Sequence, residues 1–285
     1  MIEKANAKIN LSLNVKGKLD DGYHDLETIM LPLELHDSLE ISKLPSYSTD
    51  DYVTCDDCSL KITKYNLVHL IIDAAREKFG FKDHFIVSIH KNIFLQGGLG
   101  GGSADAGAAL RAILQILNIK PTQEDLIEIG IKIGSDIPWA IFNKPTLLKR
   151  KGEILEFFDH VAPFHVFLVK PQEGLSTKAV FNTADTFSRL EHGDINKVKE
   201  LYENDDLIGL GKVCFNSLET PAISMLPEIA SIISSLKEDG FECVRMTGSG
   251  STVFALTNNK KLIKNAWKKY VNLGYDVEMT NFIKE

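Results

Sequence analysis

The sequence has no excess of basic residues, because 32 Lys and Arg stand against 39 Asp and Glu and leave a formal net charge of −7. Nucleic acids and anionic membranes attract clustered Lys and Arg, so this balance argues against both as partners. No stretch approaches the roughly 18 uninterrupted apolar residues of a membrane-spanning helix. The segment 1–6 also lacks the basic region and apolar stretch of a secretion signal. We therefore expect a cytoplasmic protein.

Cysteine is scarce, with four residues in a chain of 285. Cys55 and Cys58 form a C-x-x-C pair, but no second close pair and no H-x-H partner complete a zinc-ligand spacing. The pair lies in a polar stretch rather than between a strand and a helix, which disfavours a redox role. We interpret it as part of a surface loop with reduced thiols.

The first forty residues predict two strands joined by a turn. Within 6–15, polar residues such as Lys8 and Asn10 alternate with apolar ones, which is the period of a half-buried strand with one polar face. Residues 17–24 supply turn chemistry, and 26–41 is a second extended stretch.

Helices and short strands are predicted next along the chain. Residues 45–64 are rich in Ser, Thr, Asp and Lys, and a helix is predicted after Asn66. A short strand over 85–89 leads through a glycine-rich loop into a helix that we expect to begin at Ser103. Thr122 is the predicted N-cap of another helix.

A second set of elements follows residue 152. The periodicities predict a strand at 166–169, helices within 194–239, and strands at 243–246 and 252–256. Strands and helices are segregated rather than strictly alternating, so we predict an α+β fold with a second lobe instead of a doubly wound sheet.

The strongest chemical signal is the glycine-rich segment Gly97-Gly98-Leu99-Gly100-Gly101-Gly102-Ser103. Such a run would be costly inside a core helix or strand, because glycine loses the most backbone entropy on ordering. Without side chains, backbone N–H groups can approach an anion, and the first turn of the following helix adds positive charge. A flexible linker is the alternative, but a regular apolar helix follows immediately. The spacing matches neither the P-loop nor the dinucleotide-binding motif, and we predict a different kind of phosphate-binding loop.

This loop resembles the phosphate-binding motif of the superfamily of galactokinase, homoserine kinase, mevalonate kinase and phosphomevalonate kinase. Segments 7–13, 21–28 and 134–138 narrow the resemblance to the family in it that phosphorylates a cytidine diphosphate-linked methylerythritol. Segment 246–251 is similar to the third motif of that family, so the resemblance spans nearly the whole chain. It implies an N-terminal ATP-binding domain over 1–159, a C-terminal domain over 160–285, and an active site in the cleft between the two lobes.

The resemblance implies an ATP-dependent kinase that acts with Mg²⁺ on the 2-hydroxyl of this small molecule, in non-mevalonate isoprenoid synthesis. It makes Asp136 the base that accepts the alcohol proton and Lys8 the cation that stabilises negative charge, which is the chemistry that phosphoryl transfer needs. Asp136 lies in a tight turn between Gly134 and Pro138, although it could simply cap the next helix. Lys8 could be an ordinary solvated lysine. The metal ligands stay open, with Ser103 a candidate by analogy.

The resemblance also assigns substrate contacts. Asn10 is similar to a substrate-binding residue, His24 to the residue that reads the cytosine base, and Tyr23 and Phe181 to the aromatic walls around that base. His24 could instead be an exposed or structural histidine, and Phe181 could be buried beside Val180 in an amphipathic helix.

Two further positions, Asn66 and Lys91, resemble adenine-side contacts. The family usually has proline where Asn6 and Phe94 stand and a small residue where Gln96 stands, so the approach to the glycine loop is expected to differ in shape.

Two alternative functions stay open. A kinase of the same superfamily acting on another alcohol would not explain the Gly22-Tyr23-His24 match. A nucleotide-binding regulator without catalysis would not need both Lys8 and Asp136. The predicted partners are therefore ATP and a small-molecule substrate, and no oligomeric state is implied.

Overall fold

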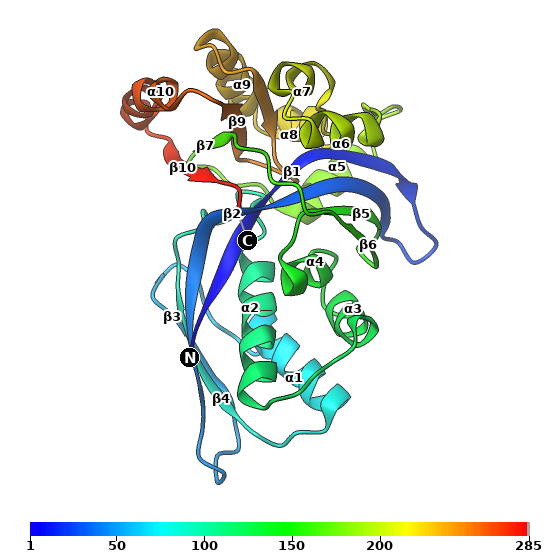
Figure 1. Ribbon diagram of the computed structural model, residues 1–285, viewed down its shortest axis with the longest axis vertical. Helices are drawn as coiled ribbons and strands as arrows, with labels where there is room; N and C mark the ends of the chain where they lie inside the picture. Colours follow the sequence, from blue (N-terminus) through cyan, green and yellow to red (C-terminus); the bar gives the residue numbers. More distant parts are fainter. Residues whose placement is uncertain (284–285) are drawn as a thin grey trace.

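The computed structural model describes residues 1–283 and shows two α+β lobes stacked along the long axis of the molecule (Figure 1). The first lobe contains a mixed sheet with strand order β3-β4-β2-β5-β6, and β1 pairs with β2 outside this path. Its strands are β1 (Ile2–Lys18), β2 (His24–Lys43), β3 (Tyr52–Cys55), β4 (Phe85–His90), β5 (Thr146–Arg150) and β6 (Ile154–Phe157). The α+β class predicted from the sequence is confirmed.

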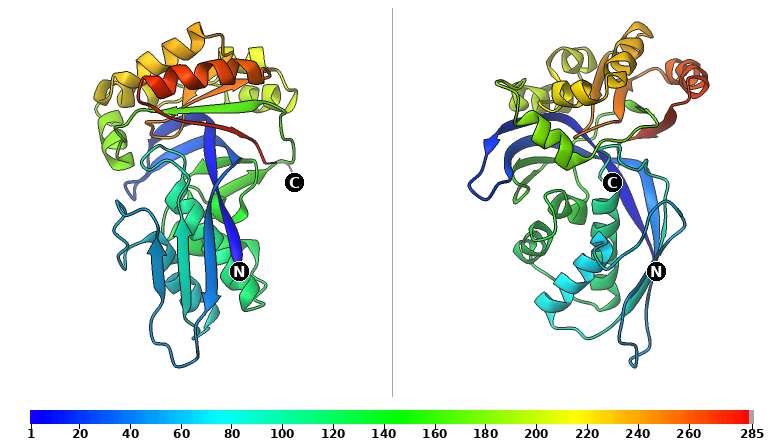
Figure 2. Two further views of the ribbon diagram at one scale, coloured as in Figure 1. Left: turned by 90° about the vertical axis from the view of Figure 1, so that its left-hand side faces the viewer. Right: turned by 180° about the vertical axis from the view of Figure 1, so that it is seen from behind.

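Helices cover one face of the first sheet, as the turned views show (Figure 2). They are α1 (Leu67–Phe79), α2 (Gly101–Ile116), α3 (Gln123–Ile131) and α4 (Ile137–Phe142). Helix α2 is rich in buried alanine. It packs so closely on α4 that a Cβ on Gly107 would lie 2.5 Å from the carbonyl group of Ala140. This contact holds α4 beside α2, and Asp136 is the residue immediately before α4.

The second lobe is built on an antiparallel sheet with strand order β10-β7-β9-β8. Its strands are β7 (His165–Lys170), β8 (Cys243–Met246), β9 (Val253–Thr257) and β10 (Asp276–Asn281). Its helices are α5 (Thr177–Ala184), α6 (Ile195–Glu203), α7 (Leu207–Val213), α8 (Glu219–Met225), α9 (Glu228–Glu238) and α10 (Lys260–Asn272).

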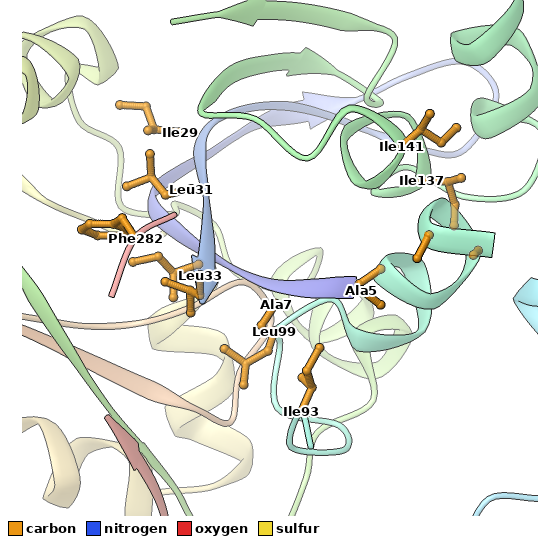
Figure 3. Packing of buried hydrophobic residues seen from close by; sticks show 14 of the residues in the cluster. Ala5, Ala7, Ile29, Leu31, Leu33, Ile93, Leu99, Ile137, Ile141 and Phe282 are labelled. Atoms are coloured by element: carbon orange, nitrogen blue, oxygen red, sulfur yellow. The ribbon is translucent and has the colours of Figure 1, made fainter. Parts of the chain in front are cut away.

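The long β1–β2 hairpin joins the two lobes. Leu13 lies beside Asn216 of the second lobe through backbone hydrogen bonds, and Leu33 pairs with Phe282 in an isolated bridge. Phe282 packs with Leu31 and Leu33 in the same buried cluster (Figure 3). Burying a side chain of this kind contributes about 1.5–3 kcal/mol, so these contacts hold the lobes against each other. The division at residue 159 stays a prediction.

Most of the predicted elements are present. Asn66 caps α1, Gly80 ends it in the left-handed conformation, and Thr122 forms a full capping box with Asp125 at the start of α3. None of the helices within residues 1–283 is long and apolar enough to cross a lipid bilayer.

Two predictions about the first lobe were wrong. Cys55 does not lie in a surface loop, because Tyr52–Cys55 forms the edge strand β3, which is held by parallel pairing to β4 rather than by its own composition. The helix after the glycine loop begins at Gly101 instead of Ser103, so two of the glycines lie in its first turn. Cys55 and Cys58 are free thiols beside this edge, and Cys58 is exposed.

Candidate active site

A cleft of about 660 Å³ lies between the lobes. The β1–β2 hairpin, the glycine loop, α5 and the loop after β8 all contribute to its walls. The residues predicted from the sequence that line it are Lys8, Asn10, Tyr23, His24, Lys91, Gly97, Gly98, Leu99, Gly100, Gly101, Gly102, Ser103, Asp136 and Phe181. The fold thus brings together groups that are up to 173 residues apart in the chain (Lys8 to Phe181).

The glycine loop has a backbone that requires glycine. Gly98 and Gly100 have φ angles of 73° and 72°, in the left-handed region that side chains disfavour. A Cβ on Gly98 would also lie 2.4 Å from the carbonyl oxygen of Thr247, so the loop packs directly on the second lobe. Gly100 caps α2 without any side chain, which leaves the first N–H groups of the helix available to an anion at the cleft.

Lys8 is held by groups from three segments. Its ammonium donates to Asn10 Oδ1 and, at 2.7 Å, to the carbonyl oxygen of Gly98, and it lies 3.9 Å from Asp136 Oδ2. Burial lowers the pKa of Lys8, and the negative charge of Asp136 offsets part of that effect. Lys8 is therefore a fixed, buried residue at the cleft and not the solvated lysine of the alternative interpretation.

Asp136 occupies the N-cap position of α4, but its carboxylate makes no capping hydrogen bond. The side chain is 40% exposed and lines the cleft. A carboxylate that is not used for capping remains able to accept a proton from a bound alcohol.

Asn10 is fixed by a chain of hydrogen bonds. Its side-chain amide donates to Thr28 Oγ1 at 2.9 Å, and Thr28 in turn donates to the carbonyl oxygen of Ser12 at 2.8 Å. The backbone N–H of Asn10 donates to Thr247 Oγ1 at 2.9 Å. The side-chain oxygen of Asn10 accepts a hydrogen bond from Lys8, so Asn10 orients the Lys8 ammonium. A contact between Asn10 and the substrate stays a prediction.

The pocket predicted for the cytosine base contains two rings in contact. The rings of His24 and Phe181 have centroids 4.6 Å apart with planes tilted by 32°. Tyr23 is 52% exposed, with Lys151 Nζ 5.6 Å from its ring centroid. Helix α5 buries Val180 completely, and Phe181 lines the cleft. The role of Phe181 as a wall around a base stays a prediction.

Of the two residues predicted to contact adenine, Lys91 lines the cleft and Asn66 does not. The side chain of Asn66 accepts from the N–H of Val68 as the N-cap of α1, and its neighbour Leu67 lines the cleft in its place. Lys91 lines the cleft, but its ammonium is bound by Asp37 and, at 2.8 Å, by Asp105. Burial would lower the pKa of Lys91, yet these carboxylates outweigh burial and raise it. Both adenine roles stay predictions.

Three residues near the cleft were not identified from the sequence. Asn216 donates to the carbonyl oxygens of Met246 and Gly248 and so fixes the loop after β8. Thr247 holds the backbone of Asn10. Asp185 hydrogen-bonds His24 at 2.7 Å. Only Thr247 lay within a recognisable motif, whereas the other two act through contacts that the fold creates.

Comparison with known proteins agrees with this architecture. Family models described as the GHMP kinases N terminal domain and the GHMP kinases C terminal match residues 66–144 and 190–276. The crystal structure of a 4-(cytidine 5'-diphospho)-2C-methyl-D-erythritol kinase superposes with a TM-score of 0.79 at 22% identity, covering 100% of both chains. The homoserine kinase from Cytophaga hutchinsonii superposes with a TM-score of 0.74 at 17% identity, over 99% of this chain and 95% of that one. The fold and cleft define a GHMP kinase, an ATP-dependent kinase of small molecules.

Sequence comparison narrows this class. The 4-diphosphocytidyl-2-C-methyl-D-erythritol kinase of Bacillus cytotoxicus is 34% identical over 287 residues, which cover 98% of this chain and 96% of the relative. The chain belongs to the family of 4-diphosphocytidyl-2-C-methyl-D-erythritol kinases. The resemblance stated from the sequence motifs is thereby confirmed.

Proposed function

We propose that the protein transfers the γ-phosphoryl group of ATP to the 2-hydroxyl of 4-diphosphocytidyl-2-C-methyl-D-erythritol, in the non-mevalonate synthesis of isoprenoids. The observation that carries this proposal is the position of Lys8 and Asp136 in one cleft that the glycine loop and the His24–Phe181 ring pair also line. Family membership supports the choice of substrate. The cytoplasmic location expected from the sequence remains part of the proposal.

In the proposed reaction, Asp136 accepts the proton of the 2-hydroxyl as its oxygen bonds to the γ-phosphorus. The bond from the γ-phosphorus to the oxygen bridging to the β-phosphorus breaks, and ADP leaves. Lys8 lies 3.9 Å from Asp136, so its positive charge is placed to stabilise the negative charge that develops on the phosphoryl group. Positioning and charge stabilisation are the main contributions that enzymes make to this kind of transfer.

ATP is proposed to bind with its phosphates over the glycine loop and the N-terminus of α2, where backbone N–H groups replace a basic patch. Mg²⁺ that accompanies a nucleotide is held mainly by phosphate oxygens and needs only one or two protein oxygens. Ser103 lines the cleft beside the loop, and its hydroxyl suits that role. The ion would neutralise phosphate charge during transfer.

ADP release with a panel of alcohols tests this proposal. The panel contains the cytidylated substrate, methylerythritol phosphate without cytidine, homoserine and mevalonate. We expect rapid ADP release only with the cytidylated compound. Activity on another alcohol alone would identify a different GHMP kinase, and no release with any alcohol would indicate a nucleotide-binding regulator.

A further inference from the structure

The segment between α7 and α8 is hydrogen-bonded to strand β1, which carries Lys8. The N–H of Leu13 donates to the carbonyl oxygen of Phe215 at 3.1 Å, and the N–H of Ser217 donates to the carbonyl oxygen of Leu13 at 2.9 Å. Asn216 lies between these two bonds and forms an isolated parallel bridge with Leu13. The backbone position of Asn216 is therefore set by the same strand that holds Lys8.

The buried side chain of Asn216 holds the loop after β8. Both of its amide hydrogens are used for this loop, because its nitrogen donates to the carbonyl oxygens of Met246 at 2.8 Å and Gly248 at 2.9 Å. Its side-chain oxygen accepts from the N–H of Leu218 at 2.9 Å, which fixes the orientation of the amide. Asn216 is 2% exposed, so water cannot readily replace these bonds.

The loop held by Asn216 returns to β1 and covers Lys8. Thr247 Oγ1 accepts from the N–H of Asn10 at 2.9 Å. A Cβ on Gly248 would lie 2.9 Å from Lys8 Nζ. It would also lie 3.0 Å from the carbonyl oxygen of Gly98 and 3.1 Å from Asn10 Oδ1, which are the two hydrogen-bond acceptors of that ammonium. The backbone of Gly248 thus shields the ammonium together with both of its acceptors.

We propose that Asn216 is a positioning residue for phosphoryl transfer, which holds the loop after β8 over Lys8 and so excludes water from the ammonium and fixes it beside the glycine loop. This inference rests on the proposed function. A charged group that is fixed and shielded from water stabilises developing charge far better than a solvated one. Without Asn216, the buried carbonyl groups of Met246 and Gly248 lose their donors, and a shift of the loop toward water restores partners to them.

The variant Asn216→Ala tests the inference through the pH dependence of activity. We expect kcat/KM to fall by about 10-fold or more, because a small displacement of a catalytic group is costly. Burial lowers the pKa of Lys8, so a loop that opens to water should move the alkaline limb of kcat/KM to higher pH. Asp136 is the charged side chain that faces Lys8, and it is unchanged in this variant.

The matched control is Asn14→Ala on the same strand. Asn14 is also a buried amide, and it donates to the carbonyl oxygen of Gly193 at 3.0 Å and accepts from the N–H of Gly193 at 3.2 Å. Its loss should lower the free energy of unfolding as the loss of Asn216 does, because each variant removes buried hydrogen bonds. The alkaline limb of Asn14→Ala should stay at the wild-type pH, and kcat/KM should stay within about threefold of the wild type.

Carbon-13 NMR of the lysine Cε atoms in the free protein measures the titration of Lys8 without catalysis, and Lys8→Met assigns the signal. Lys8 should titrate at higher pH in Asn216→Ala than in the wild type. Asn216→Ser keeps a hydroxyl donor and should shift the titration less in the same direction, which provides the comparison if Asn216→Ala does not fold.

A wild-type titration of Lys8 in the Asn216 variants, or an equal shift in Asn14→Ala, would overturn the inference. If the wild type phosphorylates no cytidylated substrate, the proposed function fails, while the titration of Lys8 still decides whether Asn216 controls its exposure to water.

Discussion

The ammonium of Lys8 and the carboxylate of Asp136 lie 3.9 Å apart, but their side chains are exposed to very different degrees, 4% and 40%. Lys8 is surrounded by the glycine loop and the loop after β8, since a Cβ on Gly248 would lie 2.9 Å from its Nζ. Asp136 is reachable from the cleft. The pair therefore combines a fixed cation with a carboxylate that a substrate hydroxyl can approach.

The substitution Asp136→Asn should separate catalysis from binding. The amide keeps the shape of the carboxylate but cannot accept the alcohol proton, so kcat should fall by about 10²-fold or more. The Kd for ATP should change by less than about threefold, because the Asp136 carboxylate makes no capping hydrogen bond in α4 that the amide would disturb. Stopped-flow kinetics and calorimetry measure the two quantities. A variant with near-normal turnover would exclude Asp136 as the base.

The pH dependence of kcat/KM should report the buried state of Lys8. Burial lowers the pKa of Lys8 below its ordinary 10.5, so the charged form is lost, and activity with it, as the pH rises through this lowered value. Asp136 opposes the shift, and in Asp136→Asn the alkaline limb of the residual activity should move to still lower pH. A limb at or above pH 10.5 in the wild type, or a limb that does not move in the variant, would contradict this assignment.

Gly98→Ala should disrupt the phosphate loop. The new methyl group would lie 2.4 Å from the carbonyl oxygen of Thr247, and the residue would also be held at a positive φ. We expect the Kd for ATP to rise by about 10-fold or more, since small displacements in a positioned site are costly. Gly274→Ala is the matched control: its φ is also positive, but nothing lies within 4 Å of its Cβ. Equal ATP affinities in the two variants would show that the packing of the loop on Thr247 is unimportant.

Asp105 is expected to destabilise the fold at neutral pH. Burial and the nearby Asp37 raise its pKa from 3.8 to about 7, and its Oδ1 has no hydrogen-bond partner. The folded protein therefore keeps a proton that the unfolded chain releases, so the wild type loses stability as the pH rises from 3.8 to about 7. Asp105→Asn removes this penalty and should raise the free energy of unfolding by about 1–3 kcal/mol at pH 8, with a smaller gain at pH 5.

Urea denaturation at the two pH values measures this difference. Asp37→Asn is the control, because Asp37 is fully buried and accepts from Lys91 and from the N–H groups of Asn92 and Ile93. Its loss should be destabilising at both pH values. An Asp105→Asn protein that gains no more at pH 8 than at pH 5 would contradict the raised pKa.

Local sequence patterns predicted much of the fold. The hairpin, α1 with its Gly80 end, the capping box at Thr122 and the strands β7, β8 and β9 all have short-range signals in apolar period, caps and turns, whereas β10 was not predicted. The edge strand β3 has no such signal, because its stability comes from pairing with β4. The start of α2 was predicted two residues late because glycine is a poor helix former, and here it lies in the first turn.

The site was predictable where motifs carry it and hidden where tertiary contacts create it. The glycine loop, Lys8 and Asp136 all line one cleft, as the resemblance implied. The two carboxylates on Lys91 and the bond from Asp185 to His24 depend on residues that are distant in the sequence. No periodicity or spacing encodes such contacts.

Product analysis tests the central claim most directly. The purified protein is incubated with ATP, Mg²⁺ and 4-diphosphocytidyl-2-C-methyl-D-erythritol, and phosphorus-31 and carbon-13 NMR locate the transferred group. The account predicts one ADP formed for each new phosphomonoester and coupling of its phosphorus to carbon 2 of the methylerythritol. ADP without a phosphorylated product, or a phosphoryl group on a different hydroxyl, would contradict it.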